Sequence, residues 1–442
     1  MAAINLKKNI LMSGGFRIII LILGFCFSLV TARYLGVELK GKLSYLITIG
    51  GFAWVILDFG LYRSYPYLIR KHPDKIPSLF AWAILCFLVE TLLLVLLCVG
   101  FTDFWNSLLG SSFSMASLLL LVGFITMTKA LMQLQGLYLG MDKVFDSSLA
   151  YMLNSMICLA IVLSGYLLIS GAEKLELAML AMVIGLSISI LYLIVKNKWG
   201  NPLKVFDWKF IYHSYGFGFR VFLSSMFILL LLKVDIVFVK KMLGFSEVGI
   251  YSIASHIVDL LQMASNLVGS LLLVRLSDTD NEVEKWQVMK KMLMVFFVLL
   301  SLANIGFVVA GKFILSTMFG KQFVPVYYVY FWLMPATYGL SFGSLFNNYL
   351  NSKGFPIISI ILPAIALLLN LALNYALIPL MGIYGAALST SIAYFMWFIL
   401  IIAYEEKITK GRMLAYLIPK SQDWMQLWKL SLETLRIRKN AE

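Results

Sequence analysis

The sequence predicts an all-α integral membrane protein, with twelve transmembrane helices in two six-helix bundles related by an internal repeat. Of the 442 residues, 61% are hydrophobic and 13% are charged, and the mean hydropathy is +0.90. Twelve apolar runs are each roughly 20 residues long, enough to cross about 30 Å of hydrocarbon. Two short motifs also occur twice, about 200 residues apart.

The apolar runs follow one another with short connections, so the loops are too small to hold extramembrane domains. The first six form a predicted bundle over 1–200, the last six a bundle over 201–405, and 406–442 a basic cytoplasmic tail. In chain order the expected spans are 11–32, 43–65, 77–101, 113–138, 147–170, 175–195, 214–239, 249–274, 291–311, 325–351, 357–379 and 383–404.

The internal repeat relates the start of each half. Residues 15–17 and 218–220 both read Gly-Phe-Arg, and residues 35–41 and 243–249 both read Leu-Gly-x4-Gly. Two halves built on one template are typical of membrane transporters. The repeat predicts that spans one and seven face each other across a central cleft.

Basic residues set the expected orientation. An even number of spans places both termini on one side, and the loops on that side hold roughly three times as many Lys and Arg as the others. We therefore expect cytoplasmic termini, with Ser112 and Glu173 outside. The net charge of +14 then reflects topology and contact with anionic lipid head groups rather than nucleic-acid binding.

The tail after Glu406 is too polar to be a thirteenth span. Its apolar residues share one helical face, which predicts an amphipathic helix that lies on the inner membrane surface or packs on the cytoplasmic loops. Those residues are Trp424, Leu427, Trp428 and Leu435, with Lys429, Arg436 and Arg438 close by.

The chain shows no signature of an enzyme. The three histidines lack metal-ligand spacing, and there is no nucleophile elbow, phosphate loop or nucleotide fingerprint. We expect no catalytic residue, no metal and no cofactor, and no ATP-driven pump. Movement driven by an H+ or Na+ gradient remains open.

Two arginines are the leading candidates for substrate binding. Arg17 and Arg220 occupy matched positions in the two copies of the repeat, each inside an apolar span. Because such a charge is costly in lipid, it should face protein or a water-filled cavity. A guanidinium binds phosphate through two parallel hydrogen bonds, so the pair predicts an anionic, phosphate-bearing substrate.

Three further residues are candidates for the same role. Lys233 and Asp235 lie in the outer part of span seven, two residues apart, so they point to different faces and each needs another partner. Lys129 lies near the cytoplasmic rim of span four, where it could bind substrate, extend to the interface or pair with an acid.

Three carboxylates are candidates for cation coupling. Glu90 lies near the middle of span three and Asp259 near the middle of span eight, while Asp58 is closer to the cytoplasmic rim. A carboxylate at membrane depth is retained for a proton or sodium ion, or because it hydrogen-bonds a neighbouring helix. The sequence leaves these alternatives open.

Several segments resemble the polysaccharide and O-antigen flippases of the multidrug, oligosaccharidyl-lipid and polysaccharide exporter superfamily. The resemblance covers essentially the whole chain, with one departure at Val274, where the family often has proline. The matching segments are 32–36, 58–61, 233–235, 248–254, 369–379, 382–387 and Thr390.

The resemblance implies two bundles in a V around a central cavity. It implies a flippase that moves a polyprenyl-pyrophosphate-linked oligosaccharide from the cytoplasmic to the outer leaflet of a bacterial cytoplasmic membrane, by alternating access. Membrane lipids would surround the lipid tail, and the polysaccharide polymerase machinery is a candidate partner. The flip itself requires no bond chemistry.

Three other functions compete with this interpretation. A cation-coupled multidrug exporter of the same superfamily would favour an acidic pocket, which two arginines oppose. A glycan-processing membrane enzyme would carry catalytic residues in a large outer loop, and the loops here are short. A scaffold for polysaccharide assembly would not depend on arginines within the membrane.

Overall fold

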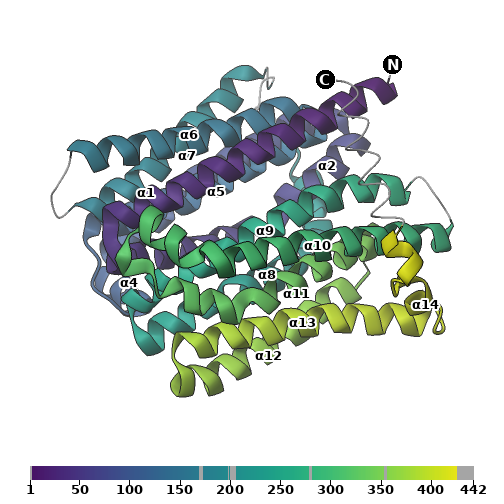
Figure 1. Cartoon of the computed structure of the whole chain (residues 1–442). Helices are drawn as coiled ribbons and strands as arrows, with labels where there is room; N and C mark the ends of the chain where they lie inside the picture. The colour runs from purple at the N-terminus through teal and green to yellow at the C-terminus, as the bar shows by residue number, and fades with distance from the viewer. Residues whose placement is uncertain are drawn as a thin grey trace, which may run out of the picture.

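The computed structural model describes residues 2–168, 173–197, 199, 206–277, 281–352 and 356–425. Within them it describes side chains from residue 15 on, apart from 168, 217, 264, 266–277, 351 and 352. The described chain is helical throughout, in two layers (Figure 1). Residues 426–442, which hold most of the predicted tail helix, lie outside the described part.

The first layer contains helices α1 to α7 and the second α8 to α14. In the first, the bounds are α1 Ala2–Asp58, α2 Leu61–Lys71, α3 Ile76–Gly100, α4 Thr102–Leu109, α5 Met115–Gly140, α6 Val144–Leu168 and α7 Lys174–Lys196, with a 3-10 turn η1 at Pro73–Lys75. In the second they are α8 Trp208–Leu243, α9 Phe245–Ser277, α10 Glu282–Ile314, α11 Val326–Ser352, α12 Ile358–Met381, α13 Ile383–Ile408 and α14 Met413–Leu417, with short turns η2 Leu315–Phe319 and η3 Lys321–Phe323.

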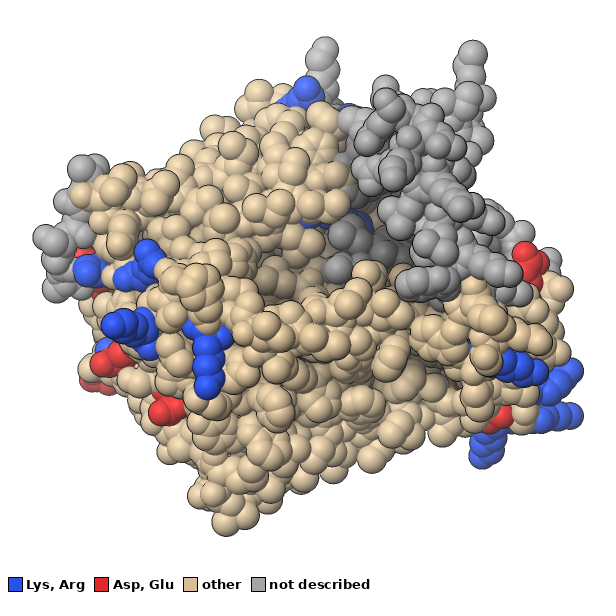
Figure 2. Space-filling view, in the orientation of Figure 1, with Lys and Arg blue, Asp and Glu red and all other residues tan. Residues whose placement is uncertain are grey.

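The predicted fold class is confirmed. In the described residues nine helical segments are long and apolar enough to cross a membrane, and the first, Gly15–Lys71, is bent at Gly36 into two crossings. Helices α9 and α11, of 33 and 27 residues, complete the predicted twelve. The charged side chains visible in Figure 2 gather at the two ends of the molecule, as a membrane-spanning belt requires.

The start of span two differs from the prediction. The expected spans leave residues 33–42 as a connection, but α1 continues through it and turns at Gly36, where φ is +73°. Lys40 is buried, and its Nζ donates a hydrogen bond to Thr31 Oγ1 at 2.8 Å. Lys42 forms an ion pair with Glu38 at 3.0 Å. An internal hydrogen bond thus accommodates Lys40, whereas the Glu38 side chain is 62% exposed.

The two layers pack within themselves and meet through few helices. Helix α1 packs on α5, α6 and α7, and α13 packs on α11 and α12. Between layers, α1 packs on α8 and α9, and α2 packs on α8. The start of α1 and α14 lie at the right-hand end in Figure 1, which we call the inner end. We call the opposite end, where α12 runs into α13 and towards which α1 runs before its turn at Gly36, the outer end. Which membrane face each end meets remains a prediction, as does the division near residue 200.

Candidate functional site

The repeated Leu-Gly-x4-Gly motifs form the contact between the halves at the outer end. A Cβ added to Gly41 would lie 1.9 Å from the Phe245 carbonyl oxygen, and one added to Gly249 would lie 2.1 Å from the Val37 oxygen. Only glycine allows the two backbones to approach so closely. We call this crossing, together with the hydrogen bond between Ser44 and Ser252 (Oγ–Oγ 3.0 Å), the outer contact.

Two basic side chains reach across the outer contact to backbone carbonyls. Arg33 Nε donates to the Met318 oxygen at 2.5 Å, and its guanidinium also contacts the Thr317 oxygen. Lys240 Nζ donates in the opposite direction, to the Gly110 oxygen at 2.7 Å. Each half therefore supplies one cation to the other.

A second contact joins the halves at the inner end. The Phe59 ring stacks on Phe219 and Phe222, with centroids 6.0 and 4.9 Å away, and a Cβ on Gly60 would lie 2.3 Å from the Gly218 oxygen. Trp82 Nε1 donates to the Tyr215 hydroxyl at 3.0 Å. These residues and the Lys75–Asp207 pair form what we call the inner contact.

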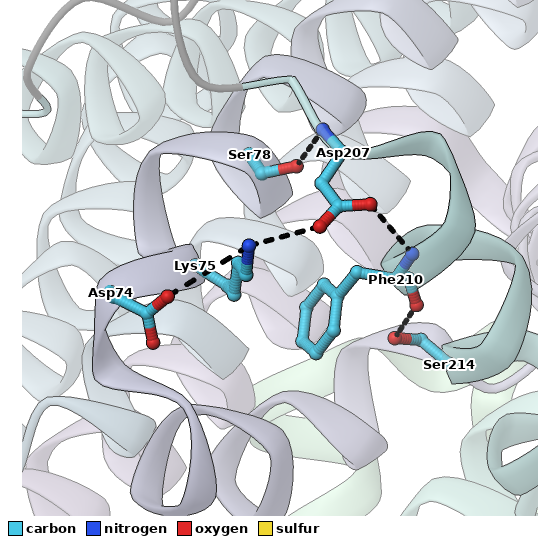
Figure 3. A network of polar contacts seen from close by, with 6 residues as sticks. All are labelled: Asp74, Lys75, Ser78, Asp207, Phe210 and Ser214. Carbon is cyan, nitrogen blue, oxygen red and sulfur yellow. Dashed lines mark hydrogen bonds and ion pairs between the residues drawn. The ribbon is translucent and has the colours of Figure 1, made fainter.

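Asp207 is the polar centre of the inner contact (Figure 3). Its carboxylate accepts the Phe210 N–H at 3.0 Å and the Lys75 ammonium at 2.9 Å, while its own N–H donates to Ser78 Oγ at 3.0 Å. The Phe210 N–H, and then Lys75, hold the pKa of Asp207 below its ordinary value. This pair therefore stays ionised well into mildly acidic conditions.

The two contacts show which spans join the halves. The described contacts join span two to span seven through Phe59, and Gly41 and Ser44 to span eight, while the facing of spans one and seven across the cleft stays a prediction. The motif at Gly36 reverses α1, so the chain that follows the turn reaches the other half.

A cavity of about 380 Å³ opens between the halves towards the inner end. Its walls come from α1, α5, α6 and α9 and are mostly apolar, and Arg17 and Met263 contribute from opposite halves. Arg17 is thus placed where a cleft arginine was expected. Arg220 is exposed on α8 but is not among the cavity's lining residues. The structure does not bring the two arginines together in this cavity.

The charged residues predicted in the spans form pairs. Lys129 on α5 forms an ion pair with Glu90 on α3, and both are largely buried. Lys233 on α8 pairs with Asp259 on α9 at 2.5 Å. The two lysines proposed for substrate and two of the acids proposed for coupling therefore neutralise each other in this conformation.

Asp58 and Asp235 make no ion pair among the described residues. Asp58, 1% exposed, accepts hydrogen bonds from Gln133 Nε2 at 3.0 Å and from the Tyr62 N–H at 3.2 Å. Asp235, also 1% exposed, occupies a different kind of site inside the second half. As expected, Lys233 and Asp235 find different partners.

The site around Asp235 is a buried cluster of oxygen-bearing side chains. Thr390 and Tyr251 donate to Oδ2 at 2.7 and 3.0 Å, and Asn374 donates to Oδ1 at 2.8 Å. Asn374 also donates to Asn370 Oδ1 at 2.8 Å, and its own Oδ1 is buried with no partner among the described residues. We call these five residues the Asp235 cluster.

Sequence reasoning missed the neutral members of the Asp235 cluster as functional candidates. Asn370 and Asn374 lie four residues apart in a strongly apolar span, and so share one helical face. Two buried amides on one face of a membrane helix were the available signal.

Comparison with known proteins supports the fold and the family. A family model described as "Polysaccharide biosynthesis protein" matches residues 6–274. The "Uncharacterized membrane protein MJ1068" of Methanocaldococcus jannaschii is 26% identical over 237 residues, which are 50% of this chain and 45% of that protein. The chain therefore spans less than half the length of this relative.

Solved transporter structures share the whole architecture. The lipid II flippase MurJ in an inward closed conformation has a TM-score of 0.72 at 15% identity, covering 97% of this chain and 93% of that chain. An inward-facing multidrug resistance MATE family transporter of the MOP superfamily has a TM-score of 0.70 at 13% identity, covering 91% and 98%. The chain belongs to the polysaccharide biosynthesis protein family and has the fold of the MOP superfamily of transporters.

Proposed function

We propose that this protein is a flippase rather than an enzyme. It moves a polyprenyl-pyrophosphate-linked oligosaccharide from the cytoplasmic to the outer leaflet of a bacterial cytoplasmic membrane, with both termini cytoplasmic. The observation that carries the proposal is the inner cavity between the halves, which combines apolar walls with Arg17. Arginine suits the pyrophosphate, and apolar walls tolerate the adjoining lipid chain.

Alternating opening of the inner and outer contacts would expose the cavity to each leaflet in turn. The two contacts lie at opposite ends of the same pair of halves, and both rest on close backbone approach. Lys233 would meet substrate in an outward-open state, when the Lys233–Asp259 pair separates. Asp235, which we expected to bind substrate, is instead enclosed within the second half.

Reconstitution tests the transport directly. Purified protein in lipid vesicles should make an inner-leaflet polyprenyl-pyrophosphate oligosaccharide accessible to an added lectin or glycosidase, well above protein-free vesicles. A single-chain phospholipid of the same charge and a cationic dye serve as control substrates. Dye transport without movement of the oligosaccharide would favour the multidrug exporter and contradict the flippase.

We also propose that the Asp235 cluster binds the coupling cation. One carboxylate among neutral hydroxyl and amide oxygens balances a single positive charge, and oxygen ligands suit a hard cation such as Na+. Rotation of the Asn374 amide would add its unpartnered oxygen to the ligands. Glu90 and Asp259 are less suited, because lysines already neutralise them.

Sodium is expected to raise the thermal unfolding temperature of the purified protein relative to choline chloride at equal ionic strength. Ligand that binds only the folded state at about 100 times its Kd adds about 2.7 kcal/mol. Asp235→Asn and Asn374→Leu should lose the sodium response, whereas Asp259→Asn should keep it. A response that survives Asp235→Asn, or is absent from the unmodified protein, would place any coupling ion elsewhere.

A further inference from the structure

A single lysine, Lys129, lies close to two carboxylates, Glu90 and Asp58, in the inner part of the first half. Lys129 is 2% exposed and forms an ion pair with Glu90, and its charge also acts on Asp58. The hydrogen-bond donors of Asp58 are neutral: Gln133 and the backbone N–H of Tyr62. Two acids and one base leave one negative charge in a buried region, which is costly unless it is neutralised.

Asp58 is also part of the inner contact through its backbone. It is the last residue of α1, and the next two residues, Phe59 and Gly60, have positive φ values of +52° and +76°. These are the residues that pack on Phe219, Phe222 and the backbone of Gly218 in the other half. Movement of the Asp58 side chain is therefore linked to the joint between the halves.

The Asp58 carboxylate stabilises the helix that follows this joint. Its Oδ2 accepts the N–H of Tyr62, which is in the first turn of α2. A negative charge at a helix N-terminus is favourable because the free N–H groups and the helix dipole point towards it. Helix α2 in turn packs on α8. Ionised Asp58 therefore favours the closed inner contact.

The Tyr65 hydroxyl is a candidate hydrogen-bond acceptor for a protonated Asp58. Tyr65 is fully buried, its hydroxyl has no hydrogen-bond partner among the described residues, and it interacts electrostatically with Asp58. The titratable and charged groups around Asp58 come from four elements: Tyr62, Arg63 and Tyr65 on α2, Cys86 and Glu90 on α3, Lys129 on α5, and Tyr215 on α8.

We propose that Asp58 is a proton-binding site that controls the inner contact. When ionised, its carboxylate holds the start of α2 and the halves stay closed at the inner end. When protonated, it neutralises the unpaired charge, turns its hydroxyl towards Tyr65, weakens the bond to the Tyr62 N–H and favours opening. The site acts on conformation, so it does not depend on the identity of the transported substrate.

The other acid of the inner contact cannot supply this response. The Phe210 N–H and then Lys75 hold the pKa of Asp207 below its ordinary value, so this carboxylate stays ionised in mildly acidic solution. Between pH 5 and 8 the Lys75–Asp207 pair keeps both charges. His72 also lies at this contact, with its ring 5.5 Å from that of Phe210, so the Asp58→Asn variant, and not the pH response alone, assigns a change over that range to Asp58.

Spin labels can report the inner contact directly. Lys71, at the end of α2, and Tyr212, near the start of α8, are both exposed, and the neighbouring His72 and Phe210 rings are 5.5 Å apart. Nitroxides on Lys71→Cys and Tyr212→Cys, with the four native cysteines replaced, would give the distance in lipid nanodiscs by double electron–electron resonance.

We expect a longer distance to appear as the pH falls from 8 to 5. Asp58→Asn should show the longer distance at both extremes. Glu90→Gln should shift the midpoint to lower pH by about one unit, because Lys129 is then left to pair with Asp58. Asp142→Asn, which removes a carboxylate that is 76% exposed and bound to Arg70, should follow the unmodified protein.

The two variants should change the inner contact in opposite directions: Asp58→Asn favours the longer distance, and Glu90→Gln favours the shorter one. A purely structural role for Asp58 would not produce this opposition. A distance that does not respond to pH, or an Asp58→Asn variant that follows the unmodified curve, would overturn the proposal. If Asp58→Asn cannot be purified as a monodisperse protein, the Glu90→Gln midpoint decides alone, and an unchanged or raised midpoint is then the contrary result. No substrate is present, so failure of the flippase proposal leaves this test intact.

Discussion

Oxidation of the double variant Ser44→Cys, Ser252→Cys is expected to reduce oligosaccharide transport to background, and reducing agent should restore it. The two hydroxyl oxygens are 3.0 Å apart across the outer contact, so the helices already have the close approach that a disulfide needs. The bond would hold the outer end closed, and alternating access requires that end to open. Transport before and after dithiothreitol, with cross-linking followed by mass spectrometry, measures the effect.

A matched pair within one half provides the control. Gln262 and Ser344 are also in contact, at 3.1 Å, but both belong to the second half. The Gln262 side chain is longer than that of cysteine, so cysteines at these positions are joined with a short bis-maleimide, which should leave transport intact because α9 and α11 pack on each other within one half. Full transport by a cross-linked 44–252 variant would show that the outer contact does not open during the cycle.

The glycines explain why this contact can be so close. Each Cβ that alanine would introduce at Gly41 or Gly249 collides with a backbone oxygen, which cannot move away as a flexible side chain can. Arg33 and Lys240 then satisfy carbonyls on the opposite half. Opening of the outer end must break both of these hydrogen bonds from a basic side chain to a carbonyl. They therefore stabilise the closed outer contact in addition to the close backbone approach.

The sequence predicted the repeat and the twelve spans because both depend on local pattern. Apolar length sets each span, and a glycine motif can be recognised without knowing its partner. It could not predict what the motif contacts: Gly41 meets Gly249 only because α1 reverses at Gly36 with a positive φ.

The candidate site was predictable by residue type but not by partner. Glu90, Lys129, Lys233 and Asp259 were recognised as charges that need compensation, and the structure shows that they compensate each other. Those pairs join different helices, so no spacing in the sequence reveals them. Asp235 was recognised for its charge, whereas its neutral partners come from α9, α12 and α13 and are visible only when the helices are packed.

Replacement of Arg17 is expected to have the second large effect. Arg17 is the cationic residue among the described residues that line the inner cavity, and the other polar side chains there, such as Gln135 and Ser147, are neutral and form weaker hydrogen bonds to a pyrophosphate. Charge-assisted hydrogen bonds contribute about 1.5–3 kcal/mol, which corresponds to a loss of about 10- to 100-fold on Arg17→Ala. Arg17→Lys keeps the charge but loses the paired geometry and should retain part of the activity. Arg17→Glu should abolish it by repulsion.

Vesicle transport and restoration of surface polysaccharide, each at equal protein abundance, measure these effects, and Arg70→Ala is the matched control. Arg70 lies at the inner end with its side chain 71% exposed and bound to Asp142 at 3.4 Å, outside the cavity, so its loss should leave transport unchanged.

Arg220→Ala, alone and with Arg17→Ala, tests whether the second arginine joins the site in another conformation. Free-energy losses that do not add up in the double variant would show that the two bind one substrate, because residues that share a ligand are not independent. Full activity of the double variant would remove the phosphate role from both arginines and leave them with structural roles.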